Sequence, residues 1–243
     1  MQDRLTSFFW SGDAIRSRSV GNVVFTATLD VPAPPARLTA DWTREIARQL
    51  DLAPGDVEPL SLARARTRWP DYRRCVQAMA DWTGTLGLKE LNGLTGLLAA
   101  SDIALMASRG ASYHHDGAQY GSAAFCNLFL SEDKGLDVHF PATGQRIPLV
   151  RGTAMVFDTG QPHAVVRRGS TGFDAADFSV AEDCTQVFLT WELPIEDARL
   201  ANALGVVFDT DRFTASRLTQ EQVWVNGVPA SVCPDSGRWR AAG

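Results

Sequence analysis

Short apolar runs separated by turn residues fill the chain between residues 101 and 193. They span residues 103–106, 123–130, 138–140, 147–150, 154–157, 164–166 and 186–191. Glycine, proline or aspartate lies between most of them, so each run ends before it reaches the length of a typical helix. Many short runs at such spacing are typical of antiparallel strands in a sandwich or barrel.

In the first hundred positions apolar residues recur at helical spacing instead. Three series predict three helices: Trp42, Ile46 and Leu50; Val76, Met79 and Trp82, after Pro70; and Leu91, Leu94, Leu97 and Leu98. Before them, the β-branched segment 22–29 predicts one strand, which the proline-rich segment 32–35 ends. This part is therefore expected to be mostly helical, with a strand at its start.

The last fifty residues carry one strong turn signal. Asn226-Gly227 lies between the apolar segment 223–225 and Val228, and this dipeptide favours a two-residue hairpin. We therefore expect an α+β fold with one domain over residues 1–243. It consists of a mostly helical part at 1–100, a strand-rich core at 101–193 and a C-terminal extension at 194–243.

Composition narrows the class of protein. The 243 residues are 45% hydrophobic and 21% charged, with a net charge of −5, which is ordinary for a soluble globular protein. The negative charge predicts no nucleic-acid and no membrane partner. Residues 1–10 lack the apolar core of a signal peptide, and no run approaches a membrane span. The four cysteines form no Cys-x-x-Cys pair, which favours reduced thiols and a cytoplasmic location.

Three of the four histidines belong to one pattern. His114-His115-Asp116 is followed by His163, which lies 47 residues after the aspartate. Because side chains alternate along a strand, His114 and Asp116 face one side and His115 the other. His163 opens the later apolar run 164–166, and the strands between leave room to bring it beside His114. Two imidazoles and one carboxylate on one face of a metal form the ligand set of non-haem Fe(II) oxygenases.

This pattern resembles that of the Fe(II)/2-oxoglutarate-dependent oxygenases, which have a double-stranded β-helix (jelly-roll, cupin-like barrel) and the motif His-x-Asp/Glu with a later His. Segments 128–133 and 152–157 resemble the prolyl-hydroxylase-like part of that family. The resemblance implies N-terminal helices packed on the barrel, Fe(II) held by His114, Asp116 and His163, and 2-oxoglutarate as cosubstrate. It further implies a hydroxylase that uses dioxygen on a small molecule, such as an amino acid or a natural-product scaffold.

One element of the family pattern differs in this chain. The family places a basic residue in the strand after the distal histidine, where it pairs with the remote carboxylate of 2-oxoglutarate, but Phe173 stands at that position. Arg167 is the best replacement, because it lies four residues after His163 and alternation puts both on one face. The other candidates for cosubstrate contact are Arg151, Arg146, Tyr120 and Asn127.

Further residues near the motif have two interpretations each. Asp158 and Gln161, on the turn before His163, either bind a polar substrate or stabilise the turn. Trp191 either lines the substrate pocket or belongs to the core. The arginine-rich segment 62–74 is interpreted as a solvated face offset by nearby acids.

Two other functions fit the same residues. Gly152, Gly160 and His163 match the spacing of a cupin motif, although Asp158 stands where that motif has proline. A cupin would be a metal-dependent dioxygenase or isomerase that does not use 2-oxoglutarate. The third candidate is a non-enzymatic ligand-binding β-sandwich with incidental histidines. No feature of the sequence indicates the substrate or the oligomeric state.

Overall fold

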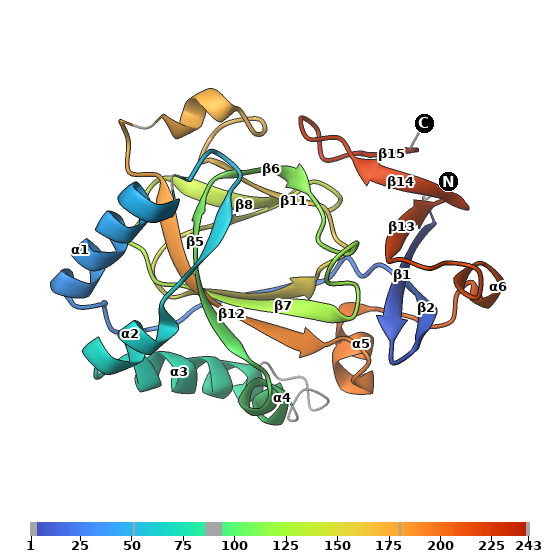
Figure 1. Cartoon of the computed structure of the whole chain (residues 1–243), viewed down its shortest axis with the longest axis horizontal. Helices are drawn as coiled ribbons and strands as arrows, with labels where there is room; N and C mark the ends of the chain where they lie inside the picture. The colour runs from blue at the N-terminus through green and yellow to red at the C-terminus, as the bar shows by residue number, and fades with distance from the viewer. Residues whose placement is uncertain (1–3, 51, 86–93, 180, 242–243) are drawn as a thin grey trace.

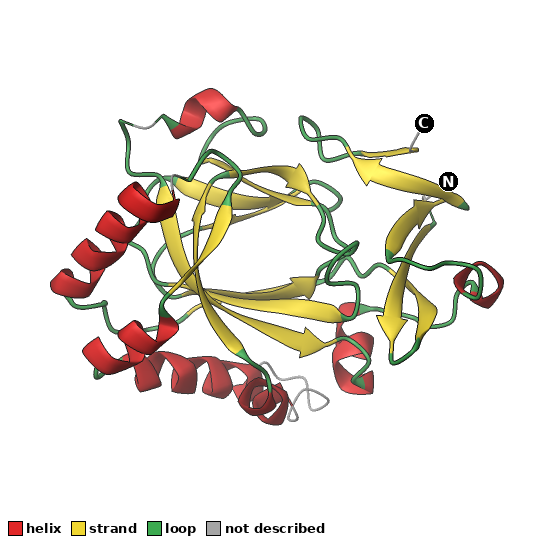
Figure 2. Cartoon of the chain, in the orientation of Figure 1, coloured by secondary structure: helices red, strands yellow, loops and turns green. Residues whose placement is uncertain are grey.

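The fold combines antiparallel β-sheets with helices on one side of them. The computed structural model describes residues 4–50, 52–85, 94–179 and 181–241, and these form three sheets with antiparallel strand pairs (Figures 1 and 2). No helix within these ranges has both the length and the apolar character needed to cross a membrane. The α+β class expected from the pattern of apolar runs is therefore confirmed at the level of a mixed fold with mostly antiparallel sheets.

The largest sheet has six strands in the order β3-β10-β7-β12-β5-β4. They are β3 (Val24–Thr28), β10 (Thr153–Asp158), β7 (Ala123–Phe129), β12 (Thr185–Pro194), β5 (Ile103–Arg109) and β4 (Val57–Leu60). Every one of these except β4 was predicted as a strand from its apolar run. The central pair β7 and β12 runs in register from Phe129 opposite Phe188 to Ala123 opposite Pro194.

A four-stranded sheet faces the first one. Its order is β6-β11-β8-β9, with β6 (Ala111–His114), β11 (His163–Arg167), β8 (Leu136–Phe140) and β9 (Gln145–Pro148). One buried apolar cluster contains side chains of both sheets, and the rings of Phe140 and Phe157 meet across it at 5.3 Å between centroids. We call the face that each sheet turns toward the other its inner face. Among the described residues, no strand of one sheet pairs with a strand of the other, so the closed barrel expected from the resemblance is not seen.

Helices cover the outer face of the six-stranded sheet (Figure 1). They are α1 (Ala36–Glu45), which continues into a π-helical turn (Ile46–Leu50), α2 (Leu62–Arg68), α3 (Tyr72–Thr85) and α4 (Leu94–Ala100). Trp42 of α1 and Met79 of α3 share one buried cluster with Leu128 of β7 and Trp191 of β12. The expected packing of N-terminal helices on the sheet is thus confirmed, while Leu91 of the third predicted helix lies outside the described residues.

The two ends of the chain form a third sheet together, here called the terminal sheet. It has five strands in the order β15-β14-β13-β1-β2, which are β1 (Leu5–Ser11), β2 (Ala14–Ser19), β13 (Gln222–Val225), β14 (Val228–Val232) and β15 (Trp239–Ala241). Leu5 pairs with Val225 across almost the whole length of the chain. Helices α5 (Ala198–Leu204) and α6 (Arg212–Ala215) precede β13, and a 3₁₀ turn (Ala175–Phe178) lies between β11 and β12.

The structure corrects the expectation of a single strand in the first hundred residues, and it confirms the expected hairpin and the interpretation of the arginine-rich segment. This part holds four strands, β1 to β4, rather than one, and β1 pairs both with its neighbour β2 and with β13 near the far end of the chain. The hairpin at Asn226-Gly227 is confirmed, and both residues take the positive φ, 52° and 86°, that a type I′ turn requires. The arginine-rich segment forms α2 and part of α3, where Arg64 pairs with Glu45 at 2.6 Å. That segment is a solvated face, as interpreted.

Candidate metal centre

The three residues of the histidine motif meet at one end of the four-stranded sheet. His163, the first residue of β11, lies directly opposite His114, the last residue of β6, and their ring centroids are 4.4 Å apart. Asp116 follows in the loop after β6, with its carboxylate oxygens 3.8 Å from His114 Nε2 and 3.6 Å from His163 Nε2. One ligand atom from each residue lies within 4.8 Å of the others. Two nitrogens and one oxygen therefore surround a common point.

Backbone carbonyls hold both imidazole rings with the same nitrogen toward that point. His114 Nδ1 lies 2.7 Å from the carbonyl oxygen of Ser112, and His163 Nδ1 lies 3.0 Å from that of Gln161. A carbonyl can only accept, so each Nδ1 carries the proton and each Nε2 presents its lone pair. Fixing the tautomer by a carbonyl in this way is the usual support of a metal-ligating histidine.

The surroundings of His163 keep its ring neutral. Burial is the largest cause that lowers the pKa of His163 to about 4, and the neighbouring His114 lowers it further, while the Asp116 carboxylate opposes both. The ring also packs on Phe157 at 5.0 Å and on Phe140 at 5.9 Å between centroids. His114, in contrast, keeps 38% of its side chain exposed. The group of three is thus walled by aromatic rings on one side and reached by solvent on the other.

The two loops that carry the candidate ligands touch each other behind the group. The backbone N–H of Asp116 donates to the carbonyl oxygen of Thr159 at 2.8 Å, and the hydroxyl of Thr159 donates back to the carbonyl oxygen of Tyr120 at 2.7 Å. Gly117 lies so close that a Cβ there would come within 2.9 Å of Gly160 Cα. The position of Asp116 is therefore tied to the position of the segment that ends at His163.

Of the two neutral candidates for cosubstrate contact, only Tyr120 lies next to the group of three, where its backbone N–H donates to the carbonyl oxygen of Asp116 at 2.7 Å. The ring of Tyr120 packs on Phe125 at 5.2 Å, and its pKa is raised by burial and by the charges of Glu192 and Asp116. Asn127 lies mid-strand on the inner face of β7, is 8% exposed, and its Oδ1 has no hydrogen-bond partner among the described residues. Both side chains are uncharged hydrogen-bonding groups.

The two arginines expected to anchor a cosubstrate already have acidic partners. Arg167 lies on the same face of β11 as His163, where its guanidinium contacts Glu182 and donates to the carbonyl oxygen of Asp177 at 2.8 Å. Arg151 pairs with Glu132 in the loop before β10 and is not brought to the group of three. Arg146 and Arg168 lie on the outer face of their strands, and both pair with Asp137.

The structure places the three candidate substrate residues away from the open side. Asp158 and Gln161 are fully buried, and Asp158 pairs with Arg18 on the outer side of β10, so Asp158 stabilises the turn. Gln161 donates to the carbonyl oxygen of Asn22 at 3.3 Å. Trp191 is fully buried among the residues that face the helices. Strand alternation explains why Trp191 belongs to the core, because it turns Thr190 rather than Trp191 toward the inner face.

Sequence reasoning missed Gln186, which occupies the inner face near the start of β12. Its side chain is fully buried, and neither amide atom has a hydrogen-bond partner among the described residues. Exposure along this face rises from Gln186 through Phe188, at 9%, to Thr190 and the exposed Glu192. Counting back by two from Phe188, which shares the inner face of β12, would have found it.

His115 turns away from the other two histidines of the motif. Its ring packs on Trp239 of β15 at 4.9 Å, and its Nδ1 accepts a hydrogen bond from the backbone of Gly117 at 3.1 Å. His139 is an ordinary strand histidine, 2.5 Å from the hydroxyl of Tyr113. Neither side chain belongs to the group of three.

No protein-family model matches the chain, and no curated protein matches it. A prolyl-4-hydroxylase of Pseudomonas putida is 20% identical, with 70% of this chain and 92% of that chain covered and a TM-score of 0.39. A prolyl hydroxylase from Trichoplax adhaerens, in complex with a peptide fragment of hypoxia inducible factor, is 10% identical over 75% and 87%, with a TM-score of 0.42. EvdO2 from Micromonospora carbonacea var. aurantiaca is 15% identical over 70% and 86%, with a TM-score of 0.41. These scores are too low to carry an argument about function.

Proposed function

We propose that the protein is a non-haem Fe(II) oxygenase in which His114, Asp116 and His163 hold the metal. The observation that carries this proposal is the convergence of two imidazole nitrogens and one carboxylate oxygen within 4.8 Å, with a solvent-reached side left open. A set of two histidines and one carboxylate suits Fe(II) chemistry, because it leaves positions for dioxygen and a second molecule. The donor types present fit the metal.

We further propose that the two facing sheets are the walls of a double-stranded β-helix within a single domain over residues 1–243. The common apolar cluster of the two sheets and the pairing of the N-terminal β1 with the C-terminal β13 support one folded unit. The location of the group of three at one end of the facing sheets supports a site that opens there.

2-Oxoglutarate is the cosubstrate that we propose, with Arg167 as the anchor of its remote carboxylate. By strand alternation, Arg167 is the single cation among the described strand residues that face between the two sheets. Anchoring requires Arg167 to exchange Glu182 for the ligand, and this is feasible because 59% of the Glu182 side chain is accessible and an ion pair with an exposed partner contributes little stability. Tyr120 and Asn127 offer uncharged hydrogen bonds nearer the metal, while Arg151 stays a weaker candidate.

The chain's own residues would bind, orient and shield in this reaction. The carbonyl oxygens of Ser112 and Gln161 hold the two rings in the ligating tautomer, and the aromatic rings of Phe140 and Phe157 exclude water from one side. A bound Fe(II) supplies the redox chemistry by which dioxygen oxidises a small-molecule substrate at the expense of the 2-oxo acid. The small substrate is an amino acid or a natural-product scaffold in our proposal.

A second candidate is a metal-dependent oxygenase, cupin-like in its site, that does not use 2-oxoglutarate. The specific observation that favours it is that, among the described strand residues, Arg167 is the single cation between the sheets, while the buried Gln186 amide has no hydrogen-bond partner in the described part of the chain. A dicarboxylate is better recognised by a charged partner than by a neutral one. This alternative keeps the same three metal ligands.

Anaerobic titration of the purified protein distinguishes these functions. Addition of Fe(II) followed by 2-oxoglutarate is expected to produce a visible metal-to-ligand charge-transfer band, and subsequent exposure to dioxygen is expected to release succinate. Fe(II) binding without that band would favour the second candidate. A protein that binds no Fe(II), Co(II) or Mn(II) would contradict both and leave the non-enzymatic β-sandwich.

A further inference from the structure

We infer that Arg18, on β2 of the terminal sheet, is a positioning residue that holds both ligand-bearing loops of the metal centre in place. The inference rests on the proposed metal centre and assigns a role to a residue outside it. Arg18 lies at the point where the terminal sheet meets the loop after Asp116 and the loop before His163. Its side chain is fully buried, although arginine is among the residues least often found so in protein interiors.

The guanidinium of Arg18 bonds to each of the two loops at once. Two of its nitrogens form a fork with the Asp158 carboxylate, at 2.6 Å and 2.9 Å. Its Nε donates to the carbonyl oxygen of Gly121 at 2.9 Å, in the loop that begins at Asp116. One guanidinium therefore joins the segment that leads to His163 with the segment that follows Asp116.

The Asp158 carboxylate extends this hydrogen-bond network to the turn before His163. Its Oδ1 accepts the backbone N–H of Gly160 at 2.8 Å, and its Oδ2 accepts that of Gly21 at 2.7 Å. Together with the two bonds from Arg18, the carboxylate has four donors and no exposed surface. Such a carboxylate fixes the path of the four residues between β10 and His163.

Because the two loops lie so close together, their separation depends on the bonds that Arg18 and Asp158 make. The Asp116 N–H to Thr159 carbonyl bond and the tight contact between Gly117 and Gly160 leave no room for either loop to shift alone. Loss of the guanidinium would release the loop at Gly121 on one side and the loop at Asp158 on the other. The distance from the Asp116 carboxylate to the His163 ring would then no longer be fixed.

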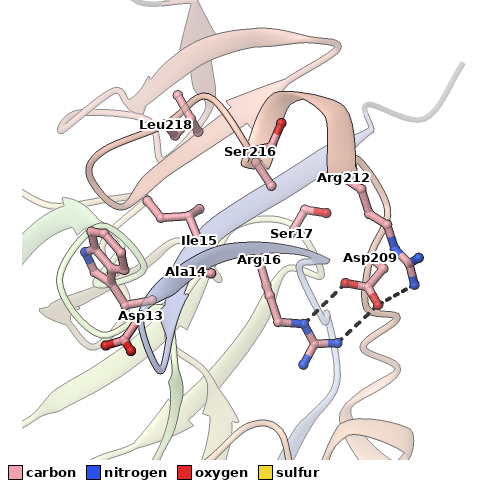
Figure 3. Close-up of a pocket in the computed structure, with 11 residues that line it drawn as sticks. Asp13, Ala14, Ile15, Arg16, Ser17, Asp209, Arg212, Ser216 and Leu218 are labelled. Atoms are coloured by element: carbon pink, nitrogen blue, oxygen red, sulfur yellow. Dashed lines mark hydrogen bonds and ion pairs between the residues drawn. The ribbon is translucent and has the colours of Figure 1, made fainter.

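Stability alone does not explain a charged pair at this place. Replacing a buried ion pair by apolar groups of similar volume is often neutral or stabilising. An arginine fork, in contrast, imposes a direction on both partners, which apolar packing does not. Arg16 of the same strand forms an ion pair in a different environment. It pairs with Asp209 at the rim of a surface pocket of about 450 Å³ and keeps 35% of its side chain exposed, whereas Arg18 is fully buried (Figure 3).

The test compares metal binding in variants of Arg18 with binding in a matched variant of Arg16. Arg18→Lys keeps a positive charge beside Asp158, but a single ammonium cannot form the fork and also reach Gly121. We expect it to fold while its Mn(II) affinity falls by about tenfold or more, as is usual when an outer partner of a ligand is lost. Arg16→Gln is expected to bind Mn(II) with wild-type affinity.

Arg18→Gln leaves a buried carboxylate without its cation and can fail to fold, so the double variant Arg18→Gln/Asp158→Asn is the companion. It removes both charges and preserves the approximate shape of the site. We expect it to unfold cooperatively, to bind Mn(II) at least about tenfold more weakly than wild type, and to give an altered visible spectrum with saturating Co(II). The Co(II) spectrum reports ligand geometry, which a residue that merely stabilises the fold would leave unchanged once metal saturates the site.

The outcomes separate the inference from the proposed function. Weakened Mn(II) binding and an altered Co(II) spectrum in the folded Arg18 variants, with an unchanged Arg16→Gln control, support the positioning role. Wild-type affinity and spectrum in Arg18→Lys and in the double variant would overturn it while leaving the metal centre intact. A wild-type protein that binds neither ion would overturn the metal centre and the positioning role together.

Discussion

His163 faces His114 across the ladder between β6 and β11, and the two rings lie 4.4 Å apart between centroids. The sheet itself makes this pairing, since the two residues are the end positions of adjacent antiparallel strands. The third group, the Asp116 carboxylate, comes from a loop instead. Two candidate ligands therefore depend on strand register, and the third depends on the contacts of its loop.

Asp116→Asn is expected to abolish tight metal binding without loss of the fold. Asparagine preserves the shape of the side chain but removes the only negative charge of the group of three. Mn(II) affinity should therefore fall by more than about 100-fold, which exceeds the usual effect of losing a residue that hydrogen-bonds to a metal ligand. Mn(II) electron paramagnetic resonance titration measures this. Arg16→Gln is the control, because that side chain pairs with Asp209 away from the group of three and should leave affinity unchanged. Equal Mn(II) affinity in Asp116→Asn and wild type would exclude the carboxylate as a ligand.

The sequence was sufficient for the β-rich middle of the chain and for bringing the motif residues together. Short apolar runs identified most strands of this region, including β11, which carries His163, because such signals are local. The strand that carries His114, β6, was not among the predicted runs. The face of Trp191 could not be assigned, since β12 is buried on both sides and its apolar pattern does not show which side meets the helices. Which neighbours a buried strand has is a property of the whole sheet.

The terminal sheet could not be predicted for a related reason. Leu5 and Val225 pair across 220 positions of sequence, and nothing local in β1 announces a partner so distant. Four of the six residues of β2 (Ala14–Ser19) are arginine or serine, so no apolar alternation marks it as a strand. In the structure one of them, Arg18, is buried and binds the two loops behind the candidate metal centre.

Gly117→Ala is expected to weaken metal binding by pushing the two ligand loops apart. The added Cβ would lie 2.9 Å from the Cα of Gly160 and 3.3 Å from a methyl carbon of Val223, and backbone at such a distance must shift. A loop displacement of this kind should cost about tenfold in Mn(II) affinity, similar to the loss of an outer partner. Gly96→Ala in α4 has open space around its Cβ and serves as the control. Unchanged affinity in Gly117→Ala would show that the loops tolerate separation.

Arg167→Gln is expected to raise the Kd for 2-oxoglutarate by about 10- to 100-fold, because a hydrogen bond to a charged group contributes about 1.5–3 kcal/mol. Titration of the charge-transfer band under anaerobic conditions measures this Kd. Arg168→Gln is the matched control, since the adjacent guanidinium lies on the outer face and pairs with Asp133 and Asp137. If both variants bind 2-oxoglutarate as tightly as wild type, Arg167 is not the anchor and the oxygenase that does not use 2-oxoglutarate gains support.

Gln186→Leu tests whether the neutral amide between the sheets has a ligand to bind. A buried amide without partners costs about 1–3 kcal/mol, so leucine of similar volume should raise the free energy of unfolding of the ligand-free protein by about 1 kcal/mol. The same change should raise the Kd for the cosubstrate, and the size of this increase measures how much the Gln186 amide contributes to binding. Denaturant unfolding and the anaerobic titration give the two values, with Gln77→Leu at an exposed position of α3 as control. If the variant gains stability and its cosubstrate affinity is unchanged, the amide is a packing defect. If the variant gains no stability, the amide already has a hydrogen-bond partner in the ligand-free protein. Only higher stability combined with weaker binding identifies Gln186 as a residue kept for a ligand at the expense of the fold.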